Sequence, residues 1–417
     1  MTDVEPLTAI HYNTAVAGPL ADVVAPPYDV IDESERAALL DQSPNNIVEI
    51  DLPRADGDPY EHARVVLARW LDEGVLVRDS APAVWALEQV YTGPDGVERT
   101  RRGFFCRVRL EEYGPGRVRP HERTHPGPKE DRLRLTRATQ VNVSPIFSLY
   151  SDPQQAAWSA LEPFVRDAPW GEVTVGDTVH RLWRVGDSST IAAVQAATAG
   201  SELLIADGHH RYETMLTYAK EVGGEGPHNY ILMCLVALED PGLTIFPTHR
   251  LVGGLDSERR TALRTAVERD FVVEEVALGD LAPAAGRGPL TMGYYDGGHR
   301  RPLRLTLRDQ AIADAALDGF SPAYRELDTG VLEALILKGA LGMSEDDIAH
   351  FNGMFYARTV EEAVSMVEDG VFEAAFIMRP TPVEQVREIA QAGENMPPKS
   401  TFFYPKLLTG LLLNPLG

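Results

Sequence analysis

The stretch SELLIADGHHRYETMLTY, residues 201–218, joins a short apolar run to a helix-like repeat through a polar turn. Residues 202–206 predict a buried strand, because Leu203 to Ala206 are apolar without a break. A helix is predicted over residues 211–222, where one face collects Tyr212, Met215, Leu216, Ala219 and Val222. We therefore predict that the intervening Asp207-Gly208-His209-His210-Arg211 is a strand-to-helix turn and the working site of the protein.

This turn has the residue types of an anion site. Gly208 lets the backbone come close to a ligand, and the first N–H groups of a helix attract negative charge. Arg211 adds a two-pronged contact to phosphate oxygens. The pattern predicts a phosphate or a nucleotide as the bound group.

The other polar residues of the turn allow proton transfer or metal binding. His209 and His210 titrate near neutral pH, so they can donate a hydrogen bond or shuttle a proton. Asp207 is a candidate Mg²⁺ ligand or a partner that orients a histidine. Glu213 suits the first turn of the helix and is expected to clamp Arg211. The alternative is an ordinary helix cap by Asp207 with surface histidines, but so many polar residues directly after a buried strand favour a functional site.

The rest of the chain alternates between segments with the repeat of a strand and segments with the repeat of a helix, which indicates a mixed α/β (α+β) fold. Helices are predicted over residues 32–41, 60–73, 129–138, 154–167, 188–198, 257–269, 327–338, 360–369 and 382–392. Strands are predicted over residues 83–91, 102–110, 145–150, 179–185, 229–238, 243–252, 271–277, 290–295, 301–307 and 372–378. At 417 residues we expect three domains, at 1–150, 151–255 and 256–417, the second of which contains the turn.

Composition limits the partners. The net charge of −23, from 62 acidic and 39 basic side chains, opposes binding to a nucleic-acid backbone, so no DNA partner is expected. A local pocket can still be positive and bind a small anion. Cys106 and Cys234 lie in apolar runs and are expected to be buried thiols in a reducing compartment. The first residues lack a signal-peptide pattern, and the longest apolar run, residues 230–238, is too short for a membrane span. We expect a cytoplasmic protein.

Residues 205–214, IADGHHRYET, resemble the signature of the family called domain of unknown function 1015, whose members are often labelled ParB-like or Spo0J-like. The resemblance extends over nearly the whole chain. It includes APPYDVI at 25–31, the segment 119–135, NVSPIF at 142–147, IFPTHR at 245–250 and NMPPKSTFFYPK at 395–406.

The turn is also similar to the nucleotide-binding turn of the ParB/sulfiredoxin superfamily, in which a Gly-x-x-Arg turn holds nucleotide phosphates. A related enzyme, the free L-serine kinase, makes O-phosphoserine. The resemblance implies a ParB/sulfiredoxin-like core with additional mixed α/β domains. It implies phosphate binding by Gly208 and Arg211, and phosphoryl transfer from ATP or ADP with Mg²⁺ by Asp207, His209 and His210. Sulfiredoxin chemistry is excluded, because its reactive cysteine would fall at one of the two histidines.

HERTH, residues 121–125, fits the H-E-x-x-H pattern of zinc proteases, but the flanking Pro120 and Pro126 prevent one continuous helix. We expect the loop around this motif to form a second wall of the anion site instead, with Arg119, His121, Glu122, Arg123, Lys129 and Arg132. His121 and Arg123 would contact phosphate, and Glu122 would act as the base that accepts a hydroxyl proton. A solvated basic loop is the alternative.

Two further clusters are candidates. PPKST, residues 397–401, ends like a phosphate loop but lacks its glycines, so Lys399 and Ser400 are expected to contact phosphate without forming a true P-loop. The alternative is a structural tail that packs its aromatic residues. Tyr28 and Asp29 follow two prolines and are candidate substrate contacts, or simply the lead-in to a helix.

The leading interpretation is a nucleotide-dependent phosphotransferase that acts on a small hydroxylated metabolite, with free serine as the acceptor implied by the resemblance. The rival is a nucleotide-binding regulator or switch without a small-molecule acceptor. A third possibility is a metal-dependent phosphoesterase. The sequence does not predict the oligomeric state.

Overall fold

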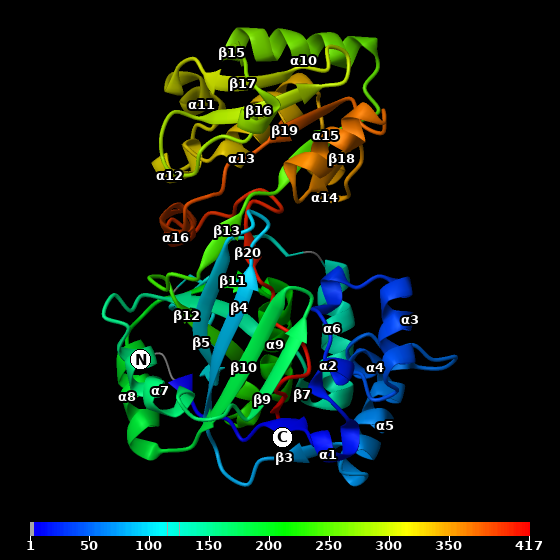
Figure 1. Cartoon of the computed structure of the whole chain (residues 1–417), viewed down its shortest axis with the longest axis vertical. Helices are drawn as coiled ribbons and strands as arrows, with labels where there is room; N and C mark the ends of the chain where they lie inside the picture. The colour runs from blue at the N-terminus through cyan, green and yellow to red at the C-terminus, as the bar shows by residue number, and fades with distance from the viewer. Residues whose placement is uncertain (1–3, 115, 125) are drawn as a thin grey trace. The chain divides into compact units, whose positions relative to one another are not determined.

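The computed structural model describes residues 4–114, 116–124 and 126–417. Its contacts group the chain into two compact units, of which the first comprises Met1–Pro120, Thr124–Leu243 and Pro405–Gly417 (Figure 1). The second comprises His121–Arg123 and Thr244–Tyr404. This grouping differs from three consecutive ranges, because the C-terminal residues return to the first unit. The three-domain division remains a prediction.

The first unit is built on a sheet of nine strands among the described residues, with the path β6-β11-β8-β12-β5-β4-β10-β9 and β1 added to β5. These strands are β1 (Val4–Glu5), β4 (Val84–Thr92), β5 (Glu98–Arg109), β6 (Val118–Arg119), β8 (Ile146–Tyr150), β9 (Gly171–Val175), β10 (Thr178–Val185), β11 (Leu203–Asp207) and β12 (Tyr230–Ala237). Most neighbours are antiparallel; β12 with β8 and β11 with β6 are parallel. Smaller pairs join β2 (Ile10–Tyr12) to β3 (Leu76–Arg78) and β7 (Val141–Asn142) to β21 (Asn414–Pro415).

Helices surround this sheet. They are α1 (Thr14–Ala17), α2 (Leu20–Val23), η1 (Tyr28–Val30), α3 (Glu33–Gln42), α4 (Val48–Asp51), α5 (Pro59–Asp72), α6 (Pro126–Thr139), α7 (Ala156–Val165), α8 (Ser188–Thr198), α9 (His209–Val222) and η2 (Pro227–Asn229). Helix α9 packs against α6, and its buried Tyr212, Met215 and Tyr218 join Leu203 and Ile205 of β11 in one apolar cluster. This burial fixes the start of α9 beside the end of β11.

The second unit has a six-stranded antiparallel sheet in the order β15-β17-β16-β19-β14-β18, and a separate pair of β13 with β20. Its elements are β13 (Thr244–Phe246), β14 (His249–Val252), α10 (Ser257–Asp270), β15 (Phe271–Glu275), η3 (Leu278–Asp280), β16 (Thr291–Asp296), β17 (Pro302–Leu307), α11 (Gln310–Ala316), α12 (Pro322–Arg325), α13 (Asp328–Leu332), the π-helix η4 (Glu333–Ala340), α14 (Glu345–Ala349), β18 (Met354–Ala357), α15 (Val360–Glu368), β19 (Ala374–Ile377), α16 (Val383–Gln391) and β20 (Phe402–Tyr404).

The mixed α/β class predicted from periodicity is confirmed. The predicted strand over residues 243–252 is wrong in one respect, because it is two strands, β13 and β14, with Pro247 between them. Proline has no N–H to donate to a sheet, which ends the first strand there. None of the helices in the described ranges is both long and apolar enough to cross a membrane.

Candidate functional site

The candidate site lies where β11 passes into α9. The pairing of β11 with β8 shifts register between Ile205 and Asp207, so that Asp207 lies opposite Phe147. Such an irregularity re-aims a side chain at the end of a strand. Gly208 then occupies the N-cap of α9 with φ +101°, and no side-chain hydrogen bond caps this helix in the structure as described. The predicted strand-to-helix turn is confirmed, with the helix beginning two residues earlier than expected.

Only glycine fits comfortably at position 208. Its φ lies in the left-handed region that other residues rarely adopt. A Cβ built there would lie 2.8 Å from Ile146 Cδ1 and 3.1 Å from Arg211 Nη2. The backbone of this turn therefore approaches its neighbours closely because residue 208 has no side chain.

Gly208→Ala is expected to destabilise the protein by about 2–4 kcal/mol, through backbone strain and the overlap with Ile146. Gly200→Ala is a matched control: Gly200 also has a positive φ, of +80°, but nothing lies within 4 Å of its Cβ position. Urea denaturation of both variants separates strain from overlap. Equal losses in the two variants would contradict the close packing at Gly208.

Asp207 is shared by two cations. Arg211 Nη2 donates to Asp207 Oδ2 at 2.8 Å, and Lys406 Nζ donates to the other oxygen, Oδ1. Arg211 Nη1 also donates to the carbonyl of Pro145. Burial alone would raise the pKa of Asp207, but Lys406 and Arg211 outweigh burial and hold that pKa well below its ordinary value. Asp207 is therefore a carboxylate at any physiological pH.

Lys406 reaches Asp207 because the chain around it is fixed by a buried polar network. Arg101 Nη2 donates to the carbonyl of Pro405 at 2.6 Å, and its guanidinium also contacts Gln89 Oε1. Gln89 Nε2 lies 3.5 Å from the carbonyl of Lys406 and 3.2 Å from His180 Nδ1. The C-terminal segment is thus attached to strands β4 and β5 at Pro405 and Lys406, and His180 of β10 contacts Gln89 behind them.

The charges of this network are fixed at neutral pH. Burial lowers the pKa of Arg101 to about 10, so it stays cationic. Burial, together with the adjacent Arg101, lowers the pKa of His180 to about 3, so it stays neutral. Arg211 and Lys406 are therefore the two cations that contact Asp207, and Arg101 anchors the segment that carries Lys406.

A second polar cluster adjoins Arg211. Arg132 Nη1 donates to Asp51 Oδ1 at 2.9 Å, and both side chains are buried. The Arg132 guanidinium lies 4.3 Å from the centre of the Tyr28 ring. These groups border a small cavity of about 40 Å³ that is lined by Asp51, Arg132, Leu135, Thr136, Val141, Asn142, Val143, Ser144, Arg211, Thr214, Met215 and Ile231.

Tyr28 lies in this cluster, whereas Asp29 is exposed in the short 3₁₀ turn that precedes α3. Burial raises the pKa of Tyr28 to about 12, against the opposing effects of Arg211 and Arg132. Its hydroxyl is therefore protonated at neutral pH. Of the two predicted substrate contacts, the structure brings only Tyr28 close to Arg211, and the role of each stays a prediction.

The two histidines lie at the start of α9, with His209 buried and His210 half-buried. His209 follows Asp207 by two residues, and its charge is the last of the influences that lower the pKa of Asp207. The expected clamp of Glu213 on Arg211 is wrong. Glu213 Oε2 accepts from Lys129 Nζ at 2.9 Å and from Thr124 Oγ1 at 2.7 Å, because its side chain faces α6 and the loop before it.

The other predicted phosphate contacts belong to the second compact unit. His121 is fully buried, and its Nε2 lies 2.9 Å from Thr401 Oγ1. Glu122 forms a parallel bridge with Met396, and the exposed Arg123 lies 3.4 Å from Glu345. The fifth position of the HERTH motif lies outside the described residues. These residues belong to the second unit and the Asp207 turn to the first, and their roles remain predictions.

The tail residues have different surroundings. Ser400 is buried, and its hydroxyl donates to the carbonyl of Pro397 at 2.7 Å and lies 2.8 Å from Thr329 Oγ1. Lys399 is exposed, with φ +56°. Phe403, three residues after Ser400, is also buried. These contacts are those of a packed structural tail, the alternative considered for PPKST, and phosphate binding by Lys399 or Ser400 stays a prediction.

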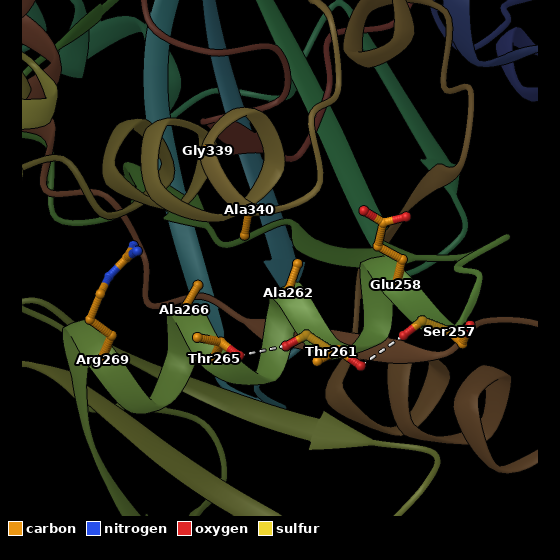
Figure 2. A pocket seen from close by; sticks show the side chains of 9 residues that line it. All are labelled: Ser257, Glu258, Thr261, Ala262, Thr265, Ala266, Arg269, Gly339 and Ala340. Carbon is orange, nitrogen blue, oxygen red and sulfur yellow. Dashed lines mark hydrogen bonds between the residues drawn. The ribbon is translucent and has the colours of Figure 1, made fainter.

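A separate hollow lies in the second unit. An open groove of about 650 Å³ runs between α10 and η4 and is lined by Ser257, Glu258, Thr261, Ala262, Thr265, Ala266, Arg269, Gly339 and Ala340 (Figure 2). Its threonine hydroxyls donate to carbonyls one turn earlier in their own helix. Arg269 pairs with Asp270. Because these polar groups are already engaged, the groove offers few convergent contacts to a small ligand.

Within the described ranges, the His, Cys, Asp and Glu side chains do not gather in groups of three or more that could hold a metal ion. Asp207 is the predicted Mg²⁺ ligand, and both of its oxygens are engaged by cations. A metal there would depend on oxygen atoms supplied by the nucleotide and water.

The family comparison decides the identification. The model of a protein family described as "Protein of unknown function (DUF1015)" matches residues 4–330. The chain belongs to this family. The match includes the whole Asp207–Arg211 turn, as the resemblance of residues 205–214 predicted. No curated protein matches the sequence of this DUF1015 member.

Solved structures similar to this DUF1015 protein are distant. A conserved hypothetical protein from Pyrococcus furiosus is 15% identical with a TM-score of 0.37, covering 74% of this chain and 95% of its own. A free serine kinase in complex with AMP is 14% identical with a TM-score of 0.36, covering 71% and 89%. SbnI with a C-terminal truncation, from Staphylococcus aureus, is 10% identical with a TM-score of 0.35, covering 70% and 82%.

Sequence reasoning missed Lys406, Arg101 and Asp51 as members of the site, whereas Arg132 was expected in its second wall. Lys406 is the last residue of the tail segment that resembles the family, and this was its only signal. Arg101 lies in β5 and is 1% exposed, but it falls one residue before the strand predicted over residues 102–110, so the sequence pattern gave no signal for it.

Proposed function

We propose that this protein is a nucleotide-dependent phosphotransferase, with a site at the Asp207–Arg211 turn and a small hydroxylated metabolite as acceptor. The observation that supports it best is the convergence of Arg211 and Lys406 on Asp207 at the N-terminus of α9. Cations and a helix N-terminus favour the phosphates of a nucleotide. Phosphoryl transfer requires mainly positioning and charge neutralisation, which these groups supply.

The chain's own residues divide the work as follows. Gly208 lets the phosphates approach the backbone, and Arg211 with Lys406 neutralises their charge. His209 lies beside Asp207 and is the proposed proton carrier, with His210 as the second candidate. Mg²⁺, held by Asp207 and the nucleotide, would neutralise further charge on the phosphates. The acceptor implied by the resemblance to the free serine kinase is L-serine.

Incubation of the full chain with Mg²⁺ and ATP or ADP, with and without L-serine, tests the proposal. The expected result is acceptor-dependent loss of the donor nucleotide and formation of O-phosphoserine, detected by mass spectrometry. A panel of other small alcohols serves if serine is not the acceptor. Nucleotide binding without turnover on any acceptor would instead support the nucleotide-binding regulator. Phosphate release from phosphorylated compounds without nucleotide would support the phosphoesterase.

A further inference from the structure

The carboxylate of Asp207 has the contacts that a bound phosphate would have. Its two oxygens accept from two different cations, Arg211 on α9 and Lys406 on the C-terminal segment. Charge-assisted contacts of this kind are also the usual way in which proteins hold phosphate oxygens. Asp207 therefore pairs with Arg211 and Lys406, the two side chains that are best suited to bind an anion at this turn.

These groups are not fully buried. The side chains of Lys406, Asp207 and Arg211 are 25%, 18% and 12% exposed, so each keeps some contact with solvent. The backbone at Lys406 is nevertheless anchored by Arg101 and Gln89. Lys406 can therefore change its partner by a side-chain movement while its backbone stays in place.

We propose that Asp207 is an internal substitute for a phosphate group, and that the phosphates of a nucleotide replace it on Lys406 and Arg211. This rests on the proposed function and extends it, because it makes Lys406 a phosphate-binding residue that no motif identified. It also assigns a function to the return of the C-terminal segment into the first unit. The ligand class is a nucleoside diphosphate or triphosphate, whose phosphate chain offers enough oxygens for both cations.

The exchange predicts effects of opposite sign for the two members of the pair. Asp207→Asn removes the competing charge and leaves both cations, so it should tighten metal-free ADP binding about tenfold. Lys406→Met removes one cation, so it should weaken that binding about 10- to 100-fold. A purely structural salt bridge predicts instead that either substitution weakens binding or leaves it unchanged.

Isothermal titration of the full chain in EDTA, with ADP and with inorganic pyrophosphate, measures both effects. Glu221→Gln and Lys220→Met are matched controls, because they make the same charge changes on the last turns of α9, in surface pairs with Arg137 and Glu112. Both controls should bind within about twofold of the wild type. Thermal unfolding of each variant confirms that it is folded.

The outcomes separate the two proposals. If the wild type binds ADP but folded Asp207→Asn binds it no more tightly than Glu221→Gln does, the exchange is wrong and the proposed function survives. Unchanged affinity of folded Lys406→Met would overturn the role of Lys406 in the same way. If neither the wild type nor Asp207→Asn binds either probe, the exchange is wrong, and the turnover assay with Mg²⁺ decides the proposed function separately. Binding of pyrophosphate but not of ADP supports the exchange and contradicts the proposal that the ligand is a nucleotide.

Discussion

Arg211→Ala is expected to weaken nucleotide binding by about 100-fold, which corresponds to about 2.7 kcal/mol. The guanidinium lies at the start of α9, donates to Asp207 and Pro145, and is the only residue of the turn that offers a fixed two-pronged donor. Its removal also leaves Asp207 with less compensation for its charge, so that repulsion of phosphate increases. Arg211→Lys keeps the charge but loses the fork, and should recover only part of the affinity.

Calorimetric titration of ADP and a thermal-shift assay with a nucleotide panel measure this effect. Arg137→Ala provides the control, because Arg137 is an arginine of α6 that pairs on the surface with Glu221 of α9. It should leave both the affinity and the nucleotide-induced shift unchanged. A full nucleotide-induced shift in folded Arg211→Ala would remove Arg211 from the site.

The sequence predicts those site residues that are close together in the chain. Gly208 and Arg211 lie within four residues, at the junction of a strand and a helix that each show clear periodicity, so their geometry follows from local structure. The same holds for Asp32, the first residue of the helix predicted over residues 32–41, whose side chain caps α3 by accepting from Glu35 N. Caps and turns depend on neighbours in sequence, and these are visible without a structure.

The part that could not be predicted depends on pairing across long separations. Lys406 contacts Asp207 across 199 residues and Arg132 contacts Asp51 across 81. No periodicity links such positions. Glu213 shows the same limit, since its place in the first turn suggested Arg211 as a partner, whereas the packing of α6 on α9 gives it Lys129. The division into units could not be predicted for the same reason, because it depends on the return of Pro405–Gly417 to the first unit.

The prediction with the largest effect on stability concerns the buried pair beside Arg211. Arg132→Met is expected to destabilise the first unit by about 3–5 kcal/mol, because it leaves the carboxylate of Asp51 buried without its cation. Arg132 donates to both the side chain and the carbonyl of Asp51, at 2.9 and 2.7 Å. The hydroxyl of Ser144, at 3.4 Å from Asp51, is too distant to compensate.

Urea denaturation of the full chain measures this loss, and two further variants test its cause. Arg134→Met removes an exposed cation two residues away on the same helix, 3.9 Å from Asp58, and should cost less than about 1 kcal/mol. The double variant Asp51→Leu/Arg132→Met removes both buried charges together, so it should recover most of the stability lost in Arg132→Met. If Arg132→Met is as mild as Arg134→Met, the pair is not held in a buried environment. If the double variant is less stable than Arg132→Met, the loss comes from packing against Tyr28 rather than from an uncompensated charge, since the Arg132 guanidinium covers that ring at 4.3 Å.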